Sequence, residues 1–240
     1  MYNQLKVEFG KMHKSMFFYC AALGFSVAGV MMATSQLFTH GLDISGSDTF
    51  LRSISDTSLL FIASLFASYF IGNGFANRTI CNEIRIGYSR ASVIMSRVLV
   101  TLPFASLSYL AYSATYALIM GFSNGFIDSE IATVDVIVRS VLFILQLMSI
   151  LSFSSLIMFW CKKLSLGMML SVCFTVVTCN ILRNVMSDNT IFRLTPFHRI
   201  TMNFESMVTQ DLLISFASAI LTLLAVVLCT FIVFRKAELK

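Results

Sequence analysis

Six long stretches of this chain contain no Asp, Glu, Lys or Arg, and they constrain the fold more than any other feature. They cover residues 15–42, 57–77, 98–127, 140–161, 164–182 and 212–234 of 240. A helix of roughly 20 apolar residues crosses the ~30 Å hydrocarbon core of a bilayer. A water-soluble domain of this length cannot bury six such segments. The sequence therefore predicts an all-α, polytopic membrane protein.

Composition supports this interpretation. Apolar residues make up 57% of the chain and charged residues 12%, against roughly 45–50% and 25% in soluble domains. We expect a single transmembrane domain over residues 1–240, with six membrane spans near residues 16–38, 57–76, 93–121, 137–160, 164–182 and 211–234.

The charged residues between the runs predict the orientation. If both termini are cytoplasmic, twelve of the 17 Lys and Arg residues lie inside, and nine of the 12 Asp and Glu residues lie outside. Every cytoplasmic segment is then net positive, as the positive-inside rule expects. We therefore expect an N-in, C-in protein. The net charge of +5 reflects this topology and does not indicate a nucleic-acid partner.

Residues 1–15 are expected to form an amphipathic helix in the cytoplasmic membrane interface. Met1, Leu5, Phe9, Met12 and Met16 recur at helical spacing, and three lysines lie off this stripe. Such a helix places its apolar side in the membrane and its lysines near anionic lipid.

The polar segment after the second span is predicted to be a short cytoplasmic helix of about two turns. Ile80 and Ile84 lie one turn apart on a single face. The expected caps are Asn77 or Thr79 at its start, Gly87 just past its end, and Ser89 at the start of the third span.

Catalytic motifs are nearly absent, and we expect no enzyme activity on this chain. There is no phosphate-binding Gly-rich loop, no zinc motif and no Cys/His cluster with metal spacing, so no metal site is predicted. Gly121-Phe-Ser123-Asn-Gly125 formally fits G-x-S-x-G, but it closes a membrane span and is interpreted as a flexible helix end. Neutral polar residues within the spans serve helix association or line a substrate pathway; the candidates for the pathway are Asn73, Gln146 and Asn180.

The run over residues 75–90, together with the six spans and the N-terminal helix, resembles the type-2 permease subunits of ABC exporters. In that family, the loop after the second span has a similar pattern of polar, acidic, Gly and Ser-Arg positions. The matching residues here are Asn77, Thr79, Ile80, Glu83, Gly87, Ser89 and Arg90. The motif covers about sixteen residues, whereas the resemblance in architecture covers the whole chain.

The resemblance implies that the short helix is a coupling helix that docks on a separate cytoplasmic ATPase. The candidate docking residues are Asn77, Arg78, Thr79, Ile80, Glu83, Ile84, Arg85, Gly87 and Arg90. It also implies a second permease chain, identical or a sister, and two ATPase copies that carry ATP and Mg²⁺, with no cofactor on this chain. In small bacterial members the substrate is often an antimicrobial peptide, exported from the plasma membrane as self-protection, for example against lantibiotics.

Two other classes of function stay open at this point. A channel or facilitator without an ATPase agrees with the absence of charges inside the spans, but it does not explain an ordered cytoplasmic helix. A membrane scaffold without transport activity is the third possibility. Transport that persists without ATP would favour the channel, and the absence of any transport would favour the scaffold.

Overall fold

The chain forms a bundle of helices. The computed structural model describes residues 2–39, 45–54, 56–126, 133–182, 185, 190–200 and 209–235, and these residues contain no β-strand. The helices are α1 (Tyr2–His13), α2 (Met16–Thr39), α3 (Gly46–Ile54), α4 (Leu60–Ala76), α5 (Thr79–Arg85), α6 (Arg90–Asn124), α7 (Thr133–Cys161), α8 (Leu164–Val176), η1 (Val177–Leu182), α10 (Thr190–Arg193), α11 (Pro196–Arg199) and α12 (Thr209–Arg235). The prediction of an all-α fold is confirmed.

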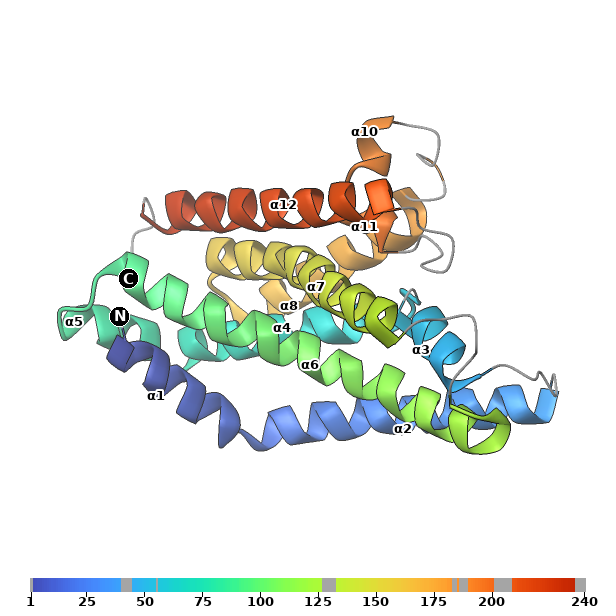
Figure 1. Cartoon of the computed structure of the whole chain (residues 1–240). Coiled ribbons are helices and arrows are strands. Elements are labelled where there is room, and N and C mark those ends of the chain that lie inside the picture. Colours follow the sequence, from blue (N-terminus) through green and yellow to red (C-terminus); the bar gives the residue numbers. More distant parts are fainter. Residues whose placement is uncertain are drawn as a thin grey trace.

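Six apolar helices run side by side along one direction. They are α2, α4, α6, α7, α8 and α12, and each overlaps one of the six uncharged runs (Figure 1). Successive helices of this set run in opposite directions. As a result, α1, α5 and the last turn of α12 lie at one end of the bundle, while α3, α10 and α11 lie at the other. We call these the inner end and the outer end.

Four of the six helices are individually long and apolar enough to cross a membrane. They cover Met16–Phe38, Arg90–Asn124, Val136–Cys161 and Asp211–Arg235. The fifth, α4, has 17 residues and continues into α5 through a bend of 56°. The sixth is shorter still, because α8 ends at Val176 and the chain continues in the wider π-helical turns of η1. The structure therefore supports a helical membrane protein, while six spans and their orientation stay predictions.

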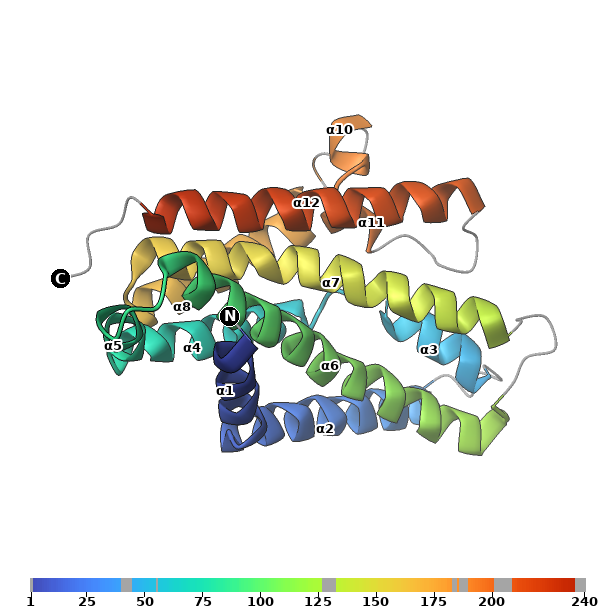
Figure 2. The ribbon, with the colours of Figure 1, turned by 60° about the vertical axis from the view of Figure 1, so that its left-hand side comes forward.

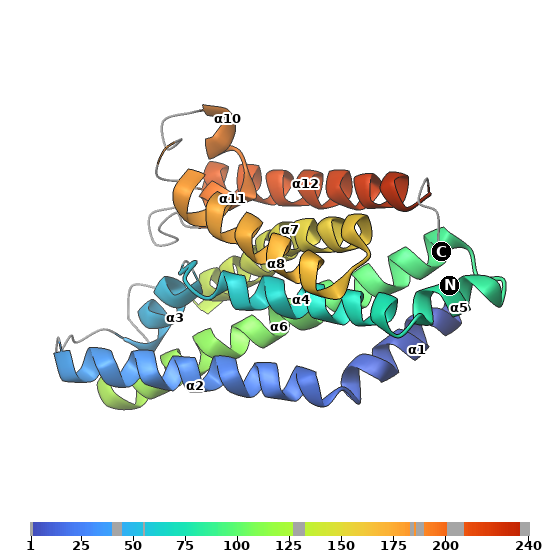
Figure 3. The same ribbon diagram turned by 180° about the vertical axis from the view of Figure 1, so that it is seen from behind.

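The helices at the centre of the bundle differ from those at its edges. Most of the apolar window of α6 and of α7 is buried within the chain, whereas little of that of α2 or α12 is. Helices α12 and α2 form opposite edges of the bundle in Figure 2, and Figure 3 shows α4 and α8 packed together on the reverse face. Exposed leucines such as Leu23 and Leu224 on the two edge helices suit contact with lipid.

Helix α1 is present as predicted, and the face that packs on the bundle is partly polar. Gln4, Glu8 and Met12 are buried against the bundle, whereas Phe9 and Met16 of the expected stripe are exposed. The Ser92 hydroxyl donates to the Gln4 side-chain carbonyl. The stripe that was expected to face the membrane is therefore divided, because Met12 packs on the bundle while Phe9 and Met16 stay exposed. Residues of α6 supply the polar partners of Gln4 and Glu8 on the packed face.

The amphipathic helix α3 was not predicted from the sequence. It packs on α6 at the outer end, where a Cβ on Gly46 would lie 3.0 Å from the Cα atom of Gly121. The Gly46 amide donates to the Gly125 carbonyl at 2.9 Å. Gly125 has φ 98° and follows the last residue of α6. The two glycines of the G-x-S-x-G match thus allow α3 to pack closely on α6 and allow α6 to end at Asn124. The Ser123 hydroxyl between them donates to the Ile119 carbonyl one turn earlier.

The described part of the segment between η1 and α12 contains two short helices, α10 and α11. Helix α11 begins at Pro196 and buries Phe197, whose ring centroid lies 5.3 Å from that of Phe153 on α7. Arg199 is also buried and donates to the Ser215 hydroxyl of α12 at 3.0 Å. These contacts fix α11 onto the outer end of the bundle.

Candidate functional site

The site is built around the bend between α4 and α5. Arg78 has φ 54°, a left-handed conformation that is uncommon for a residue with a side chain, and this residue turns the chain into α5. Neither Asn77 nor Thr79 caps α5, so that prediction was wrong. Instead, the Thr79 hydroxyl donates to the Gly74 carbonyl at 3.1 Å and links α5 back to the end of α4.

The end of α5 is as tightly defined as its start. Gly87 has φ 105°, its amide donates to the Ile84 carbonyl at 3.1 Å, and the Tyr88 amide donates to the Glu83 carbonyl at 3.2 Å. This pair of bonds is a Schellman motif. The Ser89 hydroxyl then accepts from an amide in the first turn of α6 at 3.2 Å. Both predicted caps on this side are confirmed, and they hold α5 in a fixed direction relative to α6.

Four charged side chains from three helices meet on the bundle-facing side of α5. Arg97 Nη2 of α6 lies 3.1 Å from Glu83 Oε1 of α5 and 3.6 Å from Glu8 Oε1 of α1. Lys11 Nζ lies 2.7 Å from Glu8 Oε1 and 3.2 Å from Glu83 Oε1. Arg97 and Glu8 are each 3% exposed. We call these four residues the inner ion cluster; its two cations and two anions balance, which offsets part of the cost of burial.

Gly74 makes room for the guanidinium in this cluster. A Cβ at position 74 would lie 1.8 Å from Arg97 Nη1, so no larger residue fits without moving Arg97. The same guanidinium donates from Nη2 to the Thr79 hydroxyl at 3.1 Å. The end of α4, the start of α5 and the second turn of α6 are therefore joined through one side chain.

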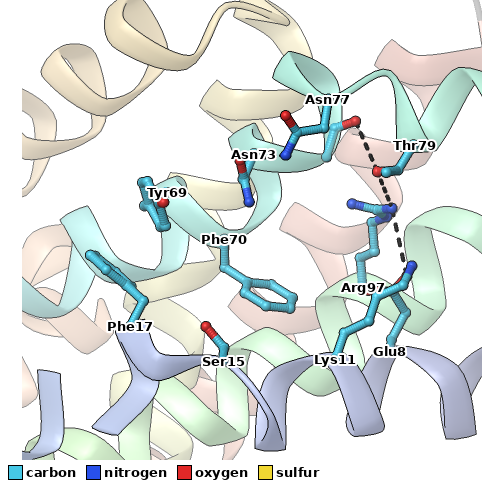
Figure 4. Close-up of a pocket in the computed structure, with 11 residues that line it drawn as sticks. Glu8, Lys11, Ser15, Phe17, Tyr69, Phe70, Asn73, Asn77, Thr79 and Arg97 are labelled. Atoms are coloured by element: carbon cyan, nitrogen blue, oxygen red, sulfur yellow. Dashed lines mark hydrogen bonds and ion pairs between the residues drawn. The ribbon is translucent and has the colours of Figure 1, made fainter. Parts of the chain in front are cut away.

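A pocket of about 320 Å³ lies beside the inner ion cluster, between α1, α4, α5 and α6. Figure 4 shows charged groups on one side of it and aromatic rings on the other. Its lining residues are Glu8, Lys11, Ser15, Phe17, Tyr69, Phe70, Asn73, Gly74, Asn77, Thr79 and Arg97. The charged side can stabilise polar groups, and the aromatic side offers an apolar surface, so the pocket matches the mixed chemistry of a membrane interface.

The segment of α5 and the turn after it has a buried side and an exposed side. Ile80 is fully buried, and Ile84 packs against the core of the chain. Ile86 is 77% exposed, Tyr88 is 41% exposed, and Arg85 is exposed beside them. A hollow of about 460 Å³ lies next to this exposed face, and its lining residues are Gly87, Tyr88, Ser89, Ala91, Ser92 and Met95. The outward apolar surface thus comes from Ile86 and Tyr88.

Two arginines at the ends of this segment have separate roles in the fold. Arg78 is exposed at the bend, as is Asn77. Arg90 is half-buried, and its Nη1 donates to the carbonyls of Phe234 at 3.4 Å and Arg235 at 3.1 Å. Arg90 therefore satisfies carbonyl groups at the C-terminus of α12, where a cation is favourable.

The three polar residues proposed to line a pathway do not come together. Asn73 lies in the pocket, where its Oδ1 atom accepts a hydrogen bond from the side-chain amide of Asn77 at 2.9 Å. Gln146 is fully buried in α7, and neither of its side-chain polar atoms has a hydrogen-bond partner. Asn180 is exposed on η1. No shared pathway is built from these three side chains in this conformation.

Sequence reasoning missed Glu8, Lys11 and Arg97 as members of the site. In the sequence, Glu8 and Lys11 counted only as charges that set the topology, and Arg97 was one of five arginines assigned to the cytoplasmic side. Glu8 occurs one turn before Met12 on the packed face of α1. A buried acid of this kind requires a cation from elsewhere, and Arg97, two turns into α6, is that cation.

Comparison of this chain with models of protein families and with curated proteins gives no match in either case.

Proposed function

We propose that this chain is the membrane-spanning permease subunit of a type-2 ABC exporter. ATP is bound and hydrolysed on separate cytoplasmic subunits, two per complex, that dock against α5. The observation that carries this proposal is the exposed turn that ends α5, where Ile86 and Tyr88 follow the last helical residue and expose apolar side chains. A helix with exposed apolar anchors beside a hollow fits a complementary groove on a partner.

The connections of α5 support a coupling role. Its last residue, Arg85, lies only five positions before the first residue of α6, Arg90. The inner ion cluster adds a second connection, because Glu83 of α5 bonds directly to Arg97 of α6. A force on α5 is therefore passed to α6 through both backbone and side chains. ATP-driven movement of the partner would tilt α6 and open the pathway alternately to each side.

The rest of the proposal follows the family resemblance. The complex contains two permease chains, identical or sisters, in a bacterial plasma membrane with both termini in the cytoplasm. The substrate is an amphipathic or antimicrobial peptide, exported for self-protection. The apolar outer faces of α2 and α12 suit both lipid and a second permease chain.

The test is purification of the chain from its native membranes in mild detergent, followed by mass spectrometry of the proteins that accompany it. We expect a soluble ATPase in near-stoichiometric amount. The double variant Ile86→Glu, Tyr88→Ala should lose it, because both exposed anchors of α5 are removed. Phe122→Glu is the matched control, since Phe122 is an exposed apolar residue at the other end of α6.

Two results would contradict the proposal. The first is a wild-type chain that emerges alone under conditions that preserve a known complex of the same kind. The second is an ATPase that stays bound to the α5 double variant and is lost from the Phe122→Glu control. In the first case, a channel without an ATPase becomes the leading hypothesis.

A further inference from the structure

A second cavity lies at the outer end of the bundle, far from α5. Its volume is about 200 Å³, and it is enclosed by α2, α3, α6 and the residues that lead into α4. Its lining residues are Met32, Gln36, Thr49, Arg52, Ser53, Asp56, Tyr112 and Tyr116. A water molecule occupies roughly 30 Å³ of liquid. The cavity therefore has room for the end of one side chain, but not for a whole peptide.

The carboxylate of Asp56 faces this cavity and accepts hydrogen bonds from neutral groups. Its Oδ1 atom accepts from the Ser58 amide at 2.9 Å and from the Ser58 hydroxyl at 2.6 Å. Its Oδ2 atom accepts from the Tyr112 hydroxyl at 3.3 Å. All three donors are neutral, and within the described part of the chain no ion pair is formed by Asp56. The negative charge is held in place by dipoles and stays available to a cation.

The one cation among the lining residues, Arg52, is directed to another acid. Its Nη2 atom lies 2.9 Å from Asp48 Oδ2, one turn earlier on α3. The Arg52 side chain is 55% exposed. Because Asp48 balances the charge of Arg52, the charge of Asp56 is left over on the cavity wall.

Aromatic rings complete the wall. Tyr109, Tyr112 and Tyr116 follow one face of α6, with ring centroids 5.9 Å and 6.2 Å apart along the series. The Tyr109 hydroxyl donates to the backbone carbonyl of Asp56 and holds that residue against α6. The faces of aromatic rings attract cations, most strongly where water is excluded. A carboxylate beside tyrosine rings is thus a site for an ammonium or guanidinium group.

We infer that the outer cavity binds the cationic end of a lysine or arginine side chain of an amphipathic peptide. This inference rests on the proposed function for the source of the cation. The side chain enters between α2 and α3, its charged group pairs with Asp56, and its alkyl chain lies against Tyr116 and Met32. The cavity would thereby select cationic peptides over neutral or acidic ones.

The test uses the purified full chain in nanodiscs, with no ATPase present. The probe is a fluorescein-labelled synthetic amphipathic peptide with a single lysine, and its twin carries acetyl-lysine at that position. Binding is measured by fluorescence anisotropy. We expect the lysine peptide to bind at least about fivefold more tightly than its neutral twin. Asp56→Asn should abolish this difference, because Asn keeps an acceptor for Ser58 but removes the charge.

Two further variants make the test specific. Tyr116→Leu should weaken binding of the lysine peptide about threefold or more, while Tyr116→Phe, which keeps the ring, should preserve it. Asp211→Asn is the matched control, because Asp211 is an acid of α12 that does not line the cavity, and it should leave binding unchanged. Size-exclusion elution and thermal unfolding show that each variant is folded.

Equal binding of the lysine and acetyl-lysine peptides to the wild-type chain would overturn the inference. So would an Asp56→Asn variant that is folded and still prefers the lysine peptide. Neither result depends on an ATPase. Failure here would therefore leave the exporter proposal standing, and failure of the co-purification experiment would leave this measurement interpretable.

Discussion

At the scale of single residues, the inner end of the bundle depends on Arg97. Its guanidinium is buried with Glu8 and bonds to Thr79 and Glu83 on α5. The pairing of Glu8 with Arg97 could not be predicted, because it joins residues far apart in sequence. The caps at Gly87 and Ser89 could be predicted, because they depend on a few neighbouring residues only. Ile80 points into the core because it packs against residues that are far away in sequence. The sequence therefore predicted only that Ile80 and Ile84 share one face of the helix.

Substitution of Arg97 should destabilise the folded protein. Arg97→Met leaves Glu8 buried with only Lys11 as a partner, and breaking a buried ion pair costs about 3–5 kcal/mol. We expect the free energy of unfolding in mixed detergent micelles to fall by that amount. Arg85→Met is the control, since Arg85 is exposed, and it should change the stability by less than about 0.5 kcal/mol.

The double variant Glu8→Leu, Arg97→Met distinguishes charge from packing. It leaves Lys11 paired with Glu83, so it should lose less stability than the sum of the two single variants. Losses that simply add would show that the four charges do not act as a unit.

At the scale of helices, each of the six uncharged runs predicted a helix, whereas the sequence did not indicate which residues of α1 pack on the bundle or that α3 forms. The six apolar runs predict helices because any other backbone would leave unpaired polar groups in lipid. The face of α1 and the existence of α3 could not be predicted in the same way. Gln4 and Glu8 are packed because α6 supplies partners, and α3 is stabilised by glycine contacts with α6. Both depend on tertiary structure.

The pairing of α2 with α6 should depend on one glycine. A Cβ on Gly29 would lie 2.1 Å from Thr115 Oγ1 and 2.6 Å from the Tyr112 carbonyl oxygen. Small residues allow this close approach of helices in membranes. Gly29→Ala should therefore lower the free energy of unfolding by about 1–3 kcal/mol.

Gly24→Ala is the matched substitution on the same helix. A Cβ there would meet nothing within 4 Å, so we expect unchanged or slightly higher stability in the same unfolding measurement. If both variants lost stability equally, the close contact at Gly29 would not be the cause.

At the scale of the whole molecule, the charge pattern predicts that α5 is cytoplasmic and the outer end extracytoplasmic. The structure places α1, α5 and the end of α12 together, which is the arrangement that an N-in, C-in chain requires. The sequence predicted the end of the second span at residue 76, where α4 ends. It did not show the left-handed conformation of Arg78 or the π-helical turns of η1 at the end of the fifth run.

Cysteine labelling tests this orientation. The six native cysteines are replaced by alanine, and single cysteines are introduced at two exposed positions, Asn82 on α5 and Ser123 at the outer end of α6. A membrane-impermeant maleimide should label Ser123→Cys in right-side-out vesicles, and Asn82→Cys only in inside-out vesicles. Labelling of both from one side would contradict a membrane-crossing α6.

Helix α6 carries both Arg97 and Tyr112 on one continuous backbone of 35 residues. These two residues are separated by about 22 Å at 1.5 Å per residue. Pro103 lies between them and removes one backbone hydrogen bond, so the helix can flex there. Two binding events that act on the same helix obey thermodynamic reciprocity. If the ATPase and the cationic side chain bind as proposed, the ATPase changes the affinity of the outer cavity by some factor. The bound side chain must then change the affinity of the chain for the ATPase by the same factor.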